Sequence, residues 1–436
     1  MIPVMRQSWA LLFGVMLLMI GNGMQGTLLG VRGEIEGFST GAMSVVMSSY
    51  FAGFLLGSQM VPGLIQRVGH VRVFAALGSL ASAGLIVYPV LLEPWAWVAL
   101  RFLLGFCFCG VYIVAESWLN NTTTNETRGR ALSLYLIAQS AGIVLAQVIF
   151  AQGDAGDYIL FIVISVLVSL AFAPMLLSAT PVPPFGAAEP MSFRAVYRTS
   201  PLAFVGIFLL GGVFAGMFGM AGVFGALAGL TPGQIALLAS AMYTGGLIAQ
   251  YPIGWASDRM DRRRIVIATA IIGAGAGVLG ATGTFGLTGI MVSGFLIGAV
   301  ASPLYGLLLA YANDVLEPSD MASASARLLF VNGVGAIGGP LVMGWLMGTI
   351  GPSGFFVLIA ILMAMLAGYA AWRLWSQPIR PPVEEAAPFV AVGANATVAS
   401  MGAVAEVHAE EGRYAEDAIT AEERAAALAA RSGSAG

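Results

Sequence analysis

Long apolar runs alternate with short polar connections along the first 376 residues. A helix needs about 20 apolar residues to cross the hydrocarbon core of a bilayer, and twelve runs approach or exceed that length. We therefore predict twelve transmembrane helices, near residues 8–30, 41–65, 71–92, 95–118, 131–151, 158–178, 201–223, 234–256, 264–285, 288–312, 326–350 and 354–376. Every predicted element is a helix, so the expected fold class is an all-α membrane protein.

Two polar stretches divide the chain further. A proline-rich stretch at 180–199 separates the sixth span from the seventh, and the chain after residue 376 contains few apolar residues. We predict an N-terminal six-helix bundle (1–179), a cytoplasmic central loop (180–199), a C-terminal six-helix bundle (200–376) and a disordered tail (377–436). The tail carries nine acidic residues and four arginines, a composition typical of disorder.

The composition supports a membrane protein. The 436 residues are 58% hydrophobic and 9% charged, whereas a soluble domain has about 25% charged residues. This excludes a soluble enzyme and a basic nucleic-acid-binding protein, and it makes the lipid bilayer the main partner. The sequence contains no nucleotide-binding loop, metal-ligand cluster or nucleophile triad, so we expect no enzymatic activity, no metal and no cofactor. We expect a monomer.

The arginines indicate how the chain crosses the membrane. Ten of them fall in the connections after even-numbered spans: Arg67, Arg72, Arg128, Arg130, Arg194, Arg198, Arg259, Arg262, Arg263 and Arg264. The opposite connections contain only Arg32, beside Glu34 and Glu36. By the positive-inside rule the arginine-rich side is cytoplasmic. An even number of spans then places both termini in the cytoplasm.

The two halves of the sequence repeat at an offset of about 193 residues. Matched pairs include Gly23 with Gly216, Tyr50 with Tyr243, Gly105 with Gly298, Tyr112 with Tyr305, and Gly142 with Gly335. The register holds across several spans and places connection on connection. Two parallel six-helix repeats related by an axis along the membrane normal are a known construction among transporters.

The connection after the eighth span reads Gly-Trp-Ala-Ser-Asp-Arg-Met-Asp-Arg-Arg over residues 254–263. This resembles the signature loop of the major facilitator superfamily, with Asp261 where that loop has glycine. The connection after the second span is a degenerate copy that keeps Arg67 and Gly69 but has Gln66 in place of the aspartate. Segment 115–120, Ala-Glu-Ser-Trp-Leu-Asn, together with Arg-Val-Gly-His at 67–70, resembles the YcaD-like bacterial subgroup.

The resemblance covers residues 1–376 and implies a transporter of the bacterial cytoplasmic (inner) membrane with the major facilitator fold. It also implies a cytoplasmic gate formed by the loop residues Gly254, Asp258, Arg259, Arg262, Arg263, Arg67 and Gly69. A carboxylate at a helix end can accept from the free N–H groups of a neighbouring helix, and the arginines can bridge to carboxylates or carbonyls. A topology anchor without any gating role is the alternative interpretation.

Charged residues inside a span are candidates for function because their burial is costly. Arg101 and Glu116 lie 15 residues apart in the fourth span, and helical geometry places them with Tyr112 on one stripe. Glu116 can carry protons, or it can pair with Arg128 or Arg130. Arg101 can bind an anionic substrate, or it can pair with a neighbouring helix. The predicted substrate pathway consists of Asn22, Gln25, Arg101, Tyr112, Glu116 and Tyr305, although the two amides can also serve helix–helix contacts.

These observations favour a secondary active transporter that moves a small solute by alternating access, with coupling to protons. A proton-coupled multidrug efflux antiporter is the first alternative. Such antiporters typically have a glycine-proline motif in the fifth span, and here Gly142 is present without the proline. A membrane scaffold or receptor on the same fold is the second. The sequence does not identify the solute.

Overall fold

The structure of the chain is a computed structural model that describes residues 2–121, 125–176, 191–376, 389, 397, 399 and 400. The described residues contain no strand. The first half contains α1 (Ile2–Ile35), α2 (Thr40–Val68), α3 (His70–Val87), α4 (Pro94–Asn121), α5 (Asn125–Gln152) and α6 (Ile159–Leu176). The second half contains α7 (Phe193–Thr199), α8 (Pro201–Ala215), η1 (Gly216–Met220), α9 (Ala221–Leu227), α10 (Pro232–Ser257), α11 (Arg262–Thr282), α12 (Gly286–Asn313), α13 (Pro318–Ile350) and α14 (Gly354–Ser376).

The helices occur in the number and order that the apolar runs predict. The seventh span is continuous through α8, the π-helical turn η1 and α9. In the described part of the chain, ten helices are long and apolar enough to cross a membrane. Two further helices, α6 and α10, occupy the sixth and eighth predicted spans. The apolar part of α6 is shorter than a usual span, and α10 has a lower mean hydropathy because it contains several polar residues.

The connection expected at 180–199 is partly helical. Ser192 is the N-cap of α7, and its hydroxyl accepts a hydrogen bond from the backbone N–H of Ala195 at 3.2 Å. The preceding residues, 177–190, lie outside the described residues. Most of the tail predicted to be disordered also lies outside them. The four tail residues that are described, 389, 397, 399 and 400, pack against the helices.

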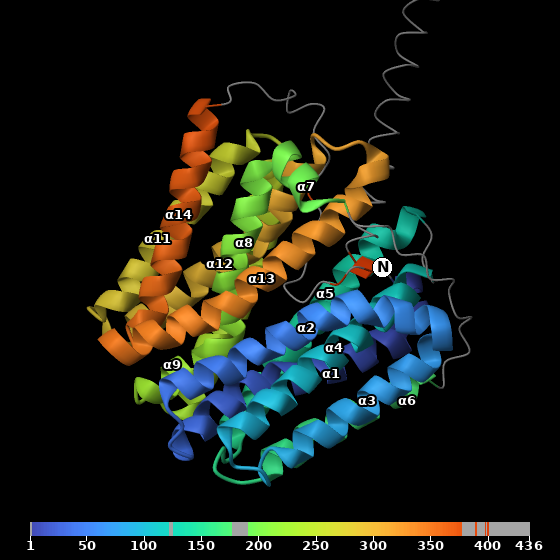
Figure 1. Ribbon diagram of the computed structural model, residues 1–436, viewed down its shortest axis with the longest axis vertical. Helices are drawn as coiled ribbons and strands as arrows, with labels where there is room; N and C mark the ends of the chain where they lie inside the picture. The colour runs from blue at the N-terminus through green and yellow to red at the C-terminus, as the bar shows by residue number, and fades with distance from the viewer. Residues whose placement is uncertain are drawn as a thin grey trace, which may run out of the picture.

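The helices form two bundles that lie at an angle to each other in Figure 1, blue to teal for the first half and green to orange for the second. Equivalent helices pack in equivalent pairs, α2 with α4 and α10 with α12, then α1 with α5 and α8 with α13. Glycines allow the closest approaches. A Cβ atom at Gly105 would lie 1.9 Å from the carbonyl oxygen of Tyr50, and one at Gly298 would lie 1.8 Å from that of Met242. The packing therefore agrees with the sequence repeat.

The two bundles touch most closely at the end that lacks the arginine-rich connections, which we call the Arg-poor end. There a Cβ atom at Gly30 would lie 2.6 Å from the backbone of Gly222, and one at Gly344 would lie 2.3 Å from Cβ of Ser44. In Figure 1 the bundles meet near α9 and diverge toward the opposite end, the Arg-rich end. The structure is therefore closed between its halves at the Arg-poor end.

Candidate functional site between the two halves

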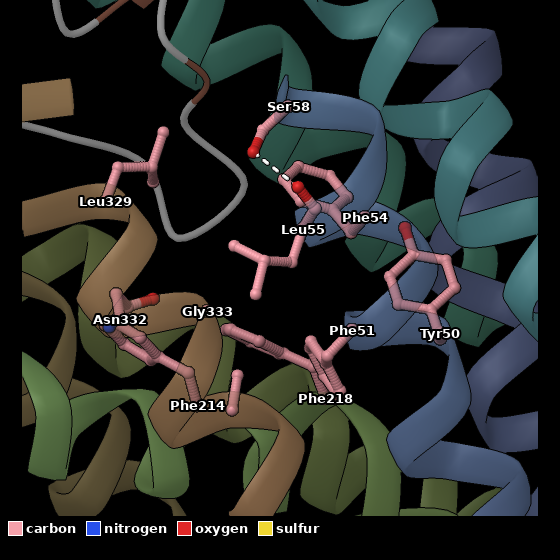
Figure 2. Close-up of a pocket in the computed structure, with 11 residues that line it drawn as sticks. Tyr50, Phe51, Phe54, Leu55, Ser58, Phe214, Phe218, Leu329, Asn332 and Gly333 are labelled. Carbon is pink, nitrogen blue, oxygen red and sulfur yellow. Dashed lines mark hydrogen bonds between the residues drawn. The ribbon is translucent and has the colours of Figure 1, made fainter. Parts of the chain in front are cut away.

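The larger of two adjoining cavities lies between α2 of the first half and α8, η1 and α13 of the second. Figure 2 shows the α2 side chains facing those of the second half across it. It encloses about 560 Å³ of empty space, part of it open to solvent. Its lining is Tyr50, Phe51, Phe54, Leu55, Ser58, Phe214, Phe218, Leu329, Asn332, Gly333 and Ala336.

The wall of this larger cavity is apolar and aromatic, and two of its polar groups are already used within the protein. The Ser58 hydroxyl donates to the Leu55 carbonyl oxygen at 2.7 Å, and Asn332 Nδ2 donates to the Ile207 carbonyl oxygen at 3.0 Å. Both bonds are made to backbone oxygens of the bundle to which the side chain belongs. This cavity therefore offers a solute mainly apolar contact.

The smaller cavity has a different chemistry. It shares Tyr50, Phe51 and Phe218 with the larger one and holds about 420 Å³ of empty space, part of it open to solvent. Its remaining lining is Asn22, Gly23, Gly26, Arg101, Ile143 and Tyr243. Asn22 and Arg101 were predicted from the sequence to belong to one pathway, and both line this cavity.

Arg101 reaches this cavity because α4 packs very closely on α2. The contact of Gly105 with the Tyr50 carbonyl places Arg101, about one turn earlier, beside Met47 and Tyr50. Its Nη2 donates to Met47 Sδ at 3.4 Å, and its guanidinium carbon lies 4.7 Å from the centre of the Tyr50 ring. Arg101 is only 3% exposed. Thioether sulfur is a weak acceptor, and an aromatic ring offsets only part of a buried charge.

Asn22 is held in place by two donors. Its Oδ1 atom accepts from Gln25 Nε2 at 2.5 Å and from the Tyr50 hydroxyl at 3.0 Å. Both lone pairs of the amide oxygen are thereby used, and the NH₂ group, which lies near the Tyr112 hydroxyl, supplies the remaining donors. Gln25 is buried and orients Asn22, but it is not part of the lining described for either cavity. The predicted amide pair therefore splits into one lining residue and one supporting residue.

The tyrosines Tyr112 and Tyr305, which the repeat matches, pack behind the lining of the described cavities and are not part of it. Tyr112 is fully buried, and its hydroxyl lies 3.6 Å from Met19 Sδ in α1. Tyr305 is also buried, and its ring packs on Phe214, a residue of the larger cavity wall. Both side chains thus fill the bundle interiors. Of the stripe predicted on α4, Arg101 is the member that lines a described cavity.

Glu116 lies toward the Arg-rich end of α4, about 22 Å along the helix from Arg101, and is 1% exposed. Its carboxylate accepts from the Tyr135 hydroxyl at 3.0 Å and from the Ser400 backbone N–H at 3.1 Å, and also from the Thr397 hydroxyl. All three groups donate to the carboxylate oxygens. Of the arginines considered as partners, Arg130 is exposed, and the side chain of Arg128 lies outside the described residues.

The signature loop connects α10 and α11 at the Arg-rich end. Asp258 Oδ1 accepts from the backbone N–H of Phe389 at 2.8 Å and lies 3.9 Å from Arg262 Nη2. Arg262 is buried, and its Nη1 donates to Asp314 Oδ1 at 2.5 Å, which ties the start of α11 to the end of α12. Arg259 is exposed and stacks on the Trp255 ring, 4.5 Å from its centre.

Asp261, the departure from the family loop, caps α11. Its Oδ1 accepts from the Arg263 backbone N–H at 2.9 Å, and its Oδ2 accepts from Arg263 Nη2 at 2.8 Å. Partial burial alone would raise the pKa of Asp261, but these hydrogen bonds and the charges of Arg263 and Arg264 outweigh burial and lower the pKa. The aspartate therefore gives α11 a charged N-cap.

The degenerate loop of the first half has simpler contacts. Gly69 has a φ of 88°, which favours glycine, and its backbone N–H donates to the Ile65 carbonyl oxygen to close α2. Gln66 and Arg67 are exposed. In the complete loop, Gly254 packs against Phe389, whose ring would lie 2.5 Å from a Cβ atom at that position.

The four aromatic residues of the smaller cavity were not among the sequence candidates: Tyr50, Phe51, Phe218 and Tyr243. Aromatic residues at helical spacing are usually packing residues, so hydropathy does not single them out. One signal was present, because Tyr50 and Tyr243 are matched by the repeat. Equivalent positions on two repeats face each other across the axis between the halves, and a matched polar aromatic pair is therefore a candidate for the shared cavity.

Two six-helix bundles with a cavity between them define a class of membrane transport proteins. The sequence profile of the Major Facilitator Superfamily matches residues 11–231 and 225–402. The chain therefore belongs to the major facilitator superfamily.

Similar proteins agree with this assignment. An uncharacterized MFS-type transporter of Enterobacter sp. strain 638 is 24% identical over 360 residues, which cover 81% of this chain and 92% of that protein. The uncharacterized MFS-type transporter YcaD of Escherichia coli strain SE11 is 24% identical over 357 residues, with the same coverage. The expected resemblance to YcaD-like proteins is thus confirmed.

Solved structures share the fold. The nucleoside transporter NupG aligns with a TM-score of 0.70 at 15% identity, covering 84% of this chain and 98% of that chain. A bacterial homologue of the human lysosomal transporter Spinster, in an inward-facing and unoccupied conformation, aligns with a TM-score of 0.61 at 14% identity, covering 93% of this chain and 98% of that chain. At these identities the likeness concerns the fold alone. Together with the family, it makes the expected transporter fold secure.

Proposed function

We propose that this protein is a secondary active transporter that moves a small solute by alternating access, with protons as the coupling ion. The observation that carries the proposal is the pair of adjoining cavities between the two bundles. Their walls contain Tyr50 and Arg101 from the first half and Phe218 and Tyr243 from the second. A solute bound there contacts both halves, so a change in their angle can expose it to either side.

The packing between the halves is that expected for one of the two end states of this cycle. The glycine contacts of Gly30 with Gly222 and of Gly344 with Ser44 close the Arg-poor end, while the bundles diverge toward the Arg-rich end. If the Arg-rich end is cytoplasmic, as the positive-inside rule indicates, the structure corresponds to an inward-facing state. Both chain termini then lie in the cytoplasm of a bacterial cell.

Glu116 is the proposed proton carrier. It is a buried carboxylate near the Arg-rich end whose hydrogen-bond partners are the uncharged groups of Tyr135, Thr397 and Ser400. No cation pairs with Glu116 among the described residues, so its carboxyl group can lose or gain a proton as the exposure of its surroundings changes during the cycle. Proton coupling would then take place about 22 Å along α4 from the arginine of the cavity.

Efflux of amphipathic compounds is a second candidate, and the wall of the larger cavity favours it. Phe51, Phe54, Phe214 and Phe218 provide apolar contact area with few polar demands. Such a wall suits solutes of varied shape better than one polar metabolite. In this second candidate protons would move inward through Glu116 as the compound moves outward.

Alternating access can be tested before the solute is known. Ser58 lines the larger cavity, and the two natural cysteines, Cys107 and Cys109, are fully buried. A membrane-impermeant maleimide should label Ser58→Cys in both right-side-out and inside-out vesicles, with the unsubstituted chain as control. Labelling from the Arg-rich side alone, under every gradient applied, would favour a static scaffold or receptor.

A further inference from the structure

Arg101 is a buried cation whose contacts do not balance its charge. The described part of the chain contains no ion pair to it, and its Nε and Nη1 atoms have no hydrogen-bond partner there. Within the described residues its side chain donates one hydrogen bond, to the weak acceptor Met47 Sδ. Inside a membrane protein an arginine in this condition is costly unless a partner of opposite charge binds to it.

The smaller cavity lies in front of this arginine. Arg101 lines it together with Asn22 and Tyr243, and the acceptor atom of Asn22 is already used by Gln25 and Tyr50. The polar groups that remain for a ligand are N–H donors of Arg101 and Asn22 and the hydroxyl of Tyr243. No acidic side chain lines this described cavity. A site made of donors and one positive charge selects an anion.

The rest of the cavity wall limits what kind of anion fits. Phe51 and Phe218 lie on both cavities, and Ile143 adds a further apolar surface. A hydrated inorganic ion gains nothing from such surfaces, whereas an organic acid can place its carboxylate on the guanidinium and its apolar body against the rings. A carboxylate also has two oxygens in one plane, and these match the two parallel N–H donors of a guanidinium group.

We propose that the smaller cavity is the binding site of a small organic carboxylate, with Arg101 as its charge partner and Asn22 as a second donor. This rests on the proposed transport function only for the consequence that the carboxylate is the transported solute. Binding itself is a property of the site. The second half contributes uncharged residues to this cavity, the ring of Phe218 and the hydroxyl of Tyr243.

The test is a thermal-shift measurement on purified protein with matched pairs of probes: acetate with acetamide, benzoate with benzamide, and nicotinate with nicotinamide. Within a pair the two probes differ chiefly in charge. At least one carboxylate should raise Tm in a concentration-dependent way, and its amide should not. In Arg101→Met the shift should disappear, corresponding to binding at least about tenfold weaker. Asn22→Ala should weaken it less.

The unliganded variant separates a binding arginine from a structural one. Methionine is apolar and similar in length, so Arg101→Met removes a charge without leaving a large gap. If Arg101 serves a ligand, the empty variant should have a Tm equal to or above that of the unsubstituted protein. A large loss of Tm would mean a structural partner and would overturn the proposal, as would equal responses to a carboxylate and its amide or no response to any carboxylate. Binding without transport would leave the site intact and contradict only the proposed function.

A separate observation concerns the described residues of the C-terminal tail. Phe389 contacts the second half, where its backbone N–H donates to Asp258 Oδ1 at 2.8 Å and its ring packs on Gly254. Thr397 and Ser400 contact the first half through the carboxylate of Glu116. Residues less than a dozen positions apart in the tail thus bind both bundles at the Arg-rich end.

The tail contacts with Glu116 are buried, whereas the contact of Phe389 with Asp258 is exposed. Thr397 is fully buried, Ser400 is 7% exposed, and the Ala399 carbonyl oxygen accepts from Asn120 Nδ2 at 3.1 Å. The partners on the two bundles, Asp258 and Glu116, are the signature-loop carboxylate and the proposed proton carrier. When the Arg-rich end closes, the space between these two partners must shrink.

We also infer that Phe389, Thr397 and Ser400, which bind Asp258 on one bundle and Glu116 on the other, oppose closure of the Arg-rich end. Weakening these contacts with Phe389→Ala and Thr397→Val should raise the rate at which Ser58→Cys is labelled from the Arg-poor side severalfold, because closure of the Arg-rich end becomes easier. Thr349→Val, at an exposed position of the Arg-poor end, is the matched control. An unchanged rate in the tail variant would overturn the inference.

Discussion

The two halves of this transporter share their packing but not their chemistry. Gly105 and Gly298 occupy equivalent positions, and each brings a helix against a backbone carbonyl of its neighbour. At the same offset of 193 residues, Arg101 corresponds to Gly294 and Glu116 to Leu309. The buried arginine and the buried carboxylate of the fourth span are therefore present in one half only.

This difference shows which features a repeat must keep. Close helix packing has to be satisfied separately in each bundle, so the glycines occur twice. A cavity between the bundles is shared, and one cation in its wall serves the whole site. A second buried arginine would add a desolvation cost and repel the first. The asymmetry is thus what we expect when two packed halves enclose one binding site.

The largest effects should come from the shared packing. Gly105→Val and Gly298→Val each place a branched side chain where a single Cβ atom would lie less than 2 Å from a carbonyl oxygen. Neither backbone can move without separating two helices, so each should cost more than the usual overpacking penalty of about 1–3 kcal/mol. We expect similar losses of Tm in detergent for the two variants.

Gly275→Val is the control for this pair, because no atom lies within 4 Å of a Cβ atom there. Its effect on Tm should be small. If only one of the two packing variants loses stability, the halves do not pack equivalently, and the comparison fails.

The next largest effect should follow from the carboxylate that only the first half contains. Glu116→Gln keeps the size of the side chain but removes its titration, so proton-driven accumulation should be lost while exchange of solute across the membrane persists. Leu309→Met, at the equivalent position of the second half, should change neither. Full proton-driven accumulation by Glu116→Gln would show that another group couples protons.

The two loops at the Arg-rich end should differ more modestly. Asp258 can supply a full negative charge to a helix end, whereas its counterpart Gln66 cannot. A charge at a helix terminus contributes about 0.3–1 kcal/mol when exposed and up to about 2 kcal/mol when partly buried. Asp258 is exposed, so Asp258→Asn should shift the balance of the two states by up to about fivefold, and Gln66→Ala should leave it nearly unchanged. Cysteine-labelling rates at the Arg-rich end measure both, and equal effects would contradict the difference.

The smallest effect concerns the positions of Gly69 and Asp261, which correspond at an offset of 192 residues. Asp261 has a lowered pKa, so it stabilises the fold at pH values above the ordinary range of an aspartate, and this contribution disappears as the pH falls through its lowered pKa. Asp261→Asn should lose at most about 1 kcal/mol at neutral pH, because the group is a third exposed. The loss should vanish in strong acid, and a loss that grows with acidity would be contrary to this sign.

Hydropathy and the repeat predict most of the fold because both follow from rules that act along the chain. A span must be long and apolar, and a signature loop has a recognisable pattern of residues. Even α10, which has a lower mean hydropathy than the other long helices, contains an apolar run that approaches the length of a span. The helical turn of α7 was missed because a seven-residue segment in a polar stretch gives too short a periodic signal.

The site was predictable only in part because it depends on which faces meet in three dimensions. Arg101 and Asn22 stood out as polar groups in apolar spans, and both line the cavity. Tyr112 shares a stripe with Arg101 on α4 but packs against α1, since the neighbouring helices cover different parts of one face. Contacts of the tail with Glu116 and Asp258 have no signal in hydropathy at all.

The central claim, that the two bundles rock about a shared cavity, is tested most directly by distances between spin labels. One pair at Arg72 and Arg264 spans the Arg-rich end, and another at Val90 and Phe285 spans the Arg-poor end; all four positions are exposed. Pulsed electron resonance in nanodiscs at several pH values should show two populations, in which one distance shortens as the other lengthens. A single unchanging distribution for both pairs, with the Arg-poor end always closed, would contradict the account.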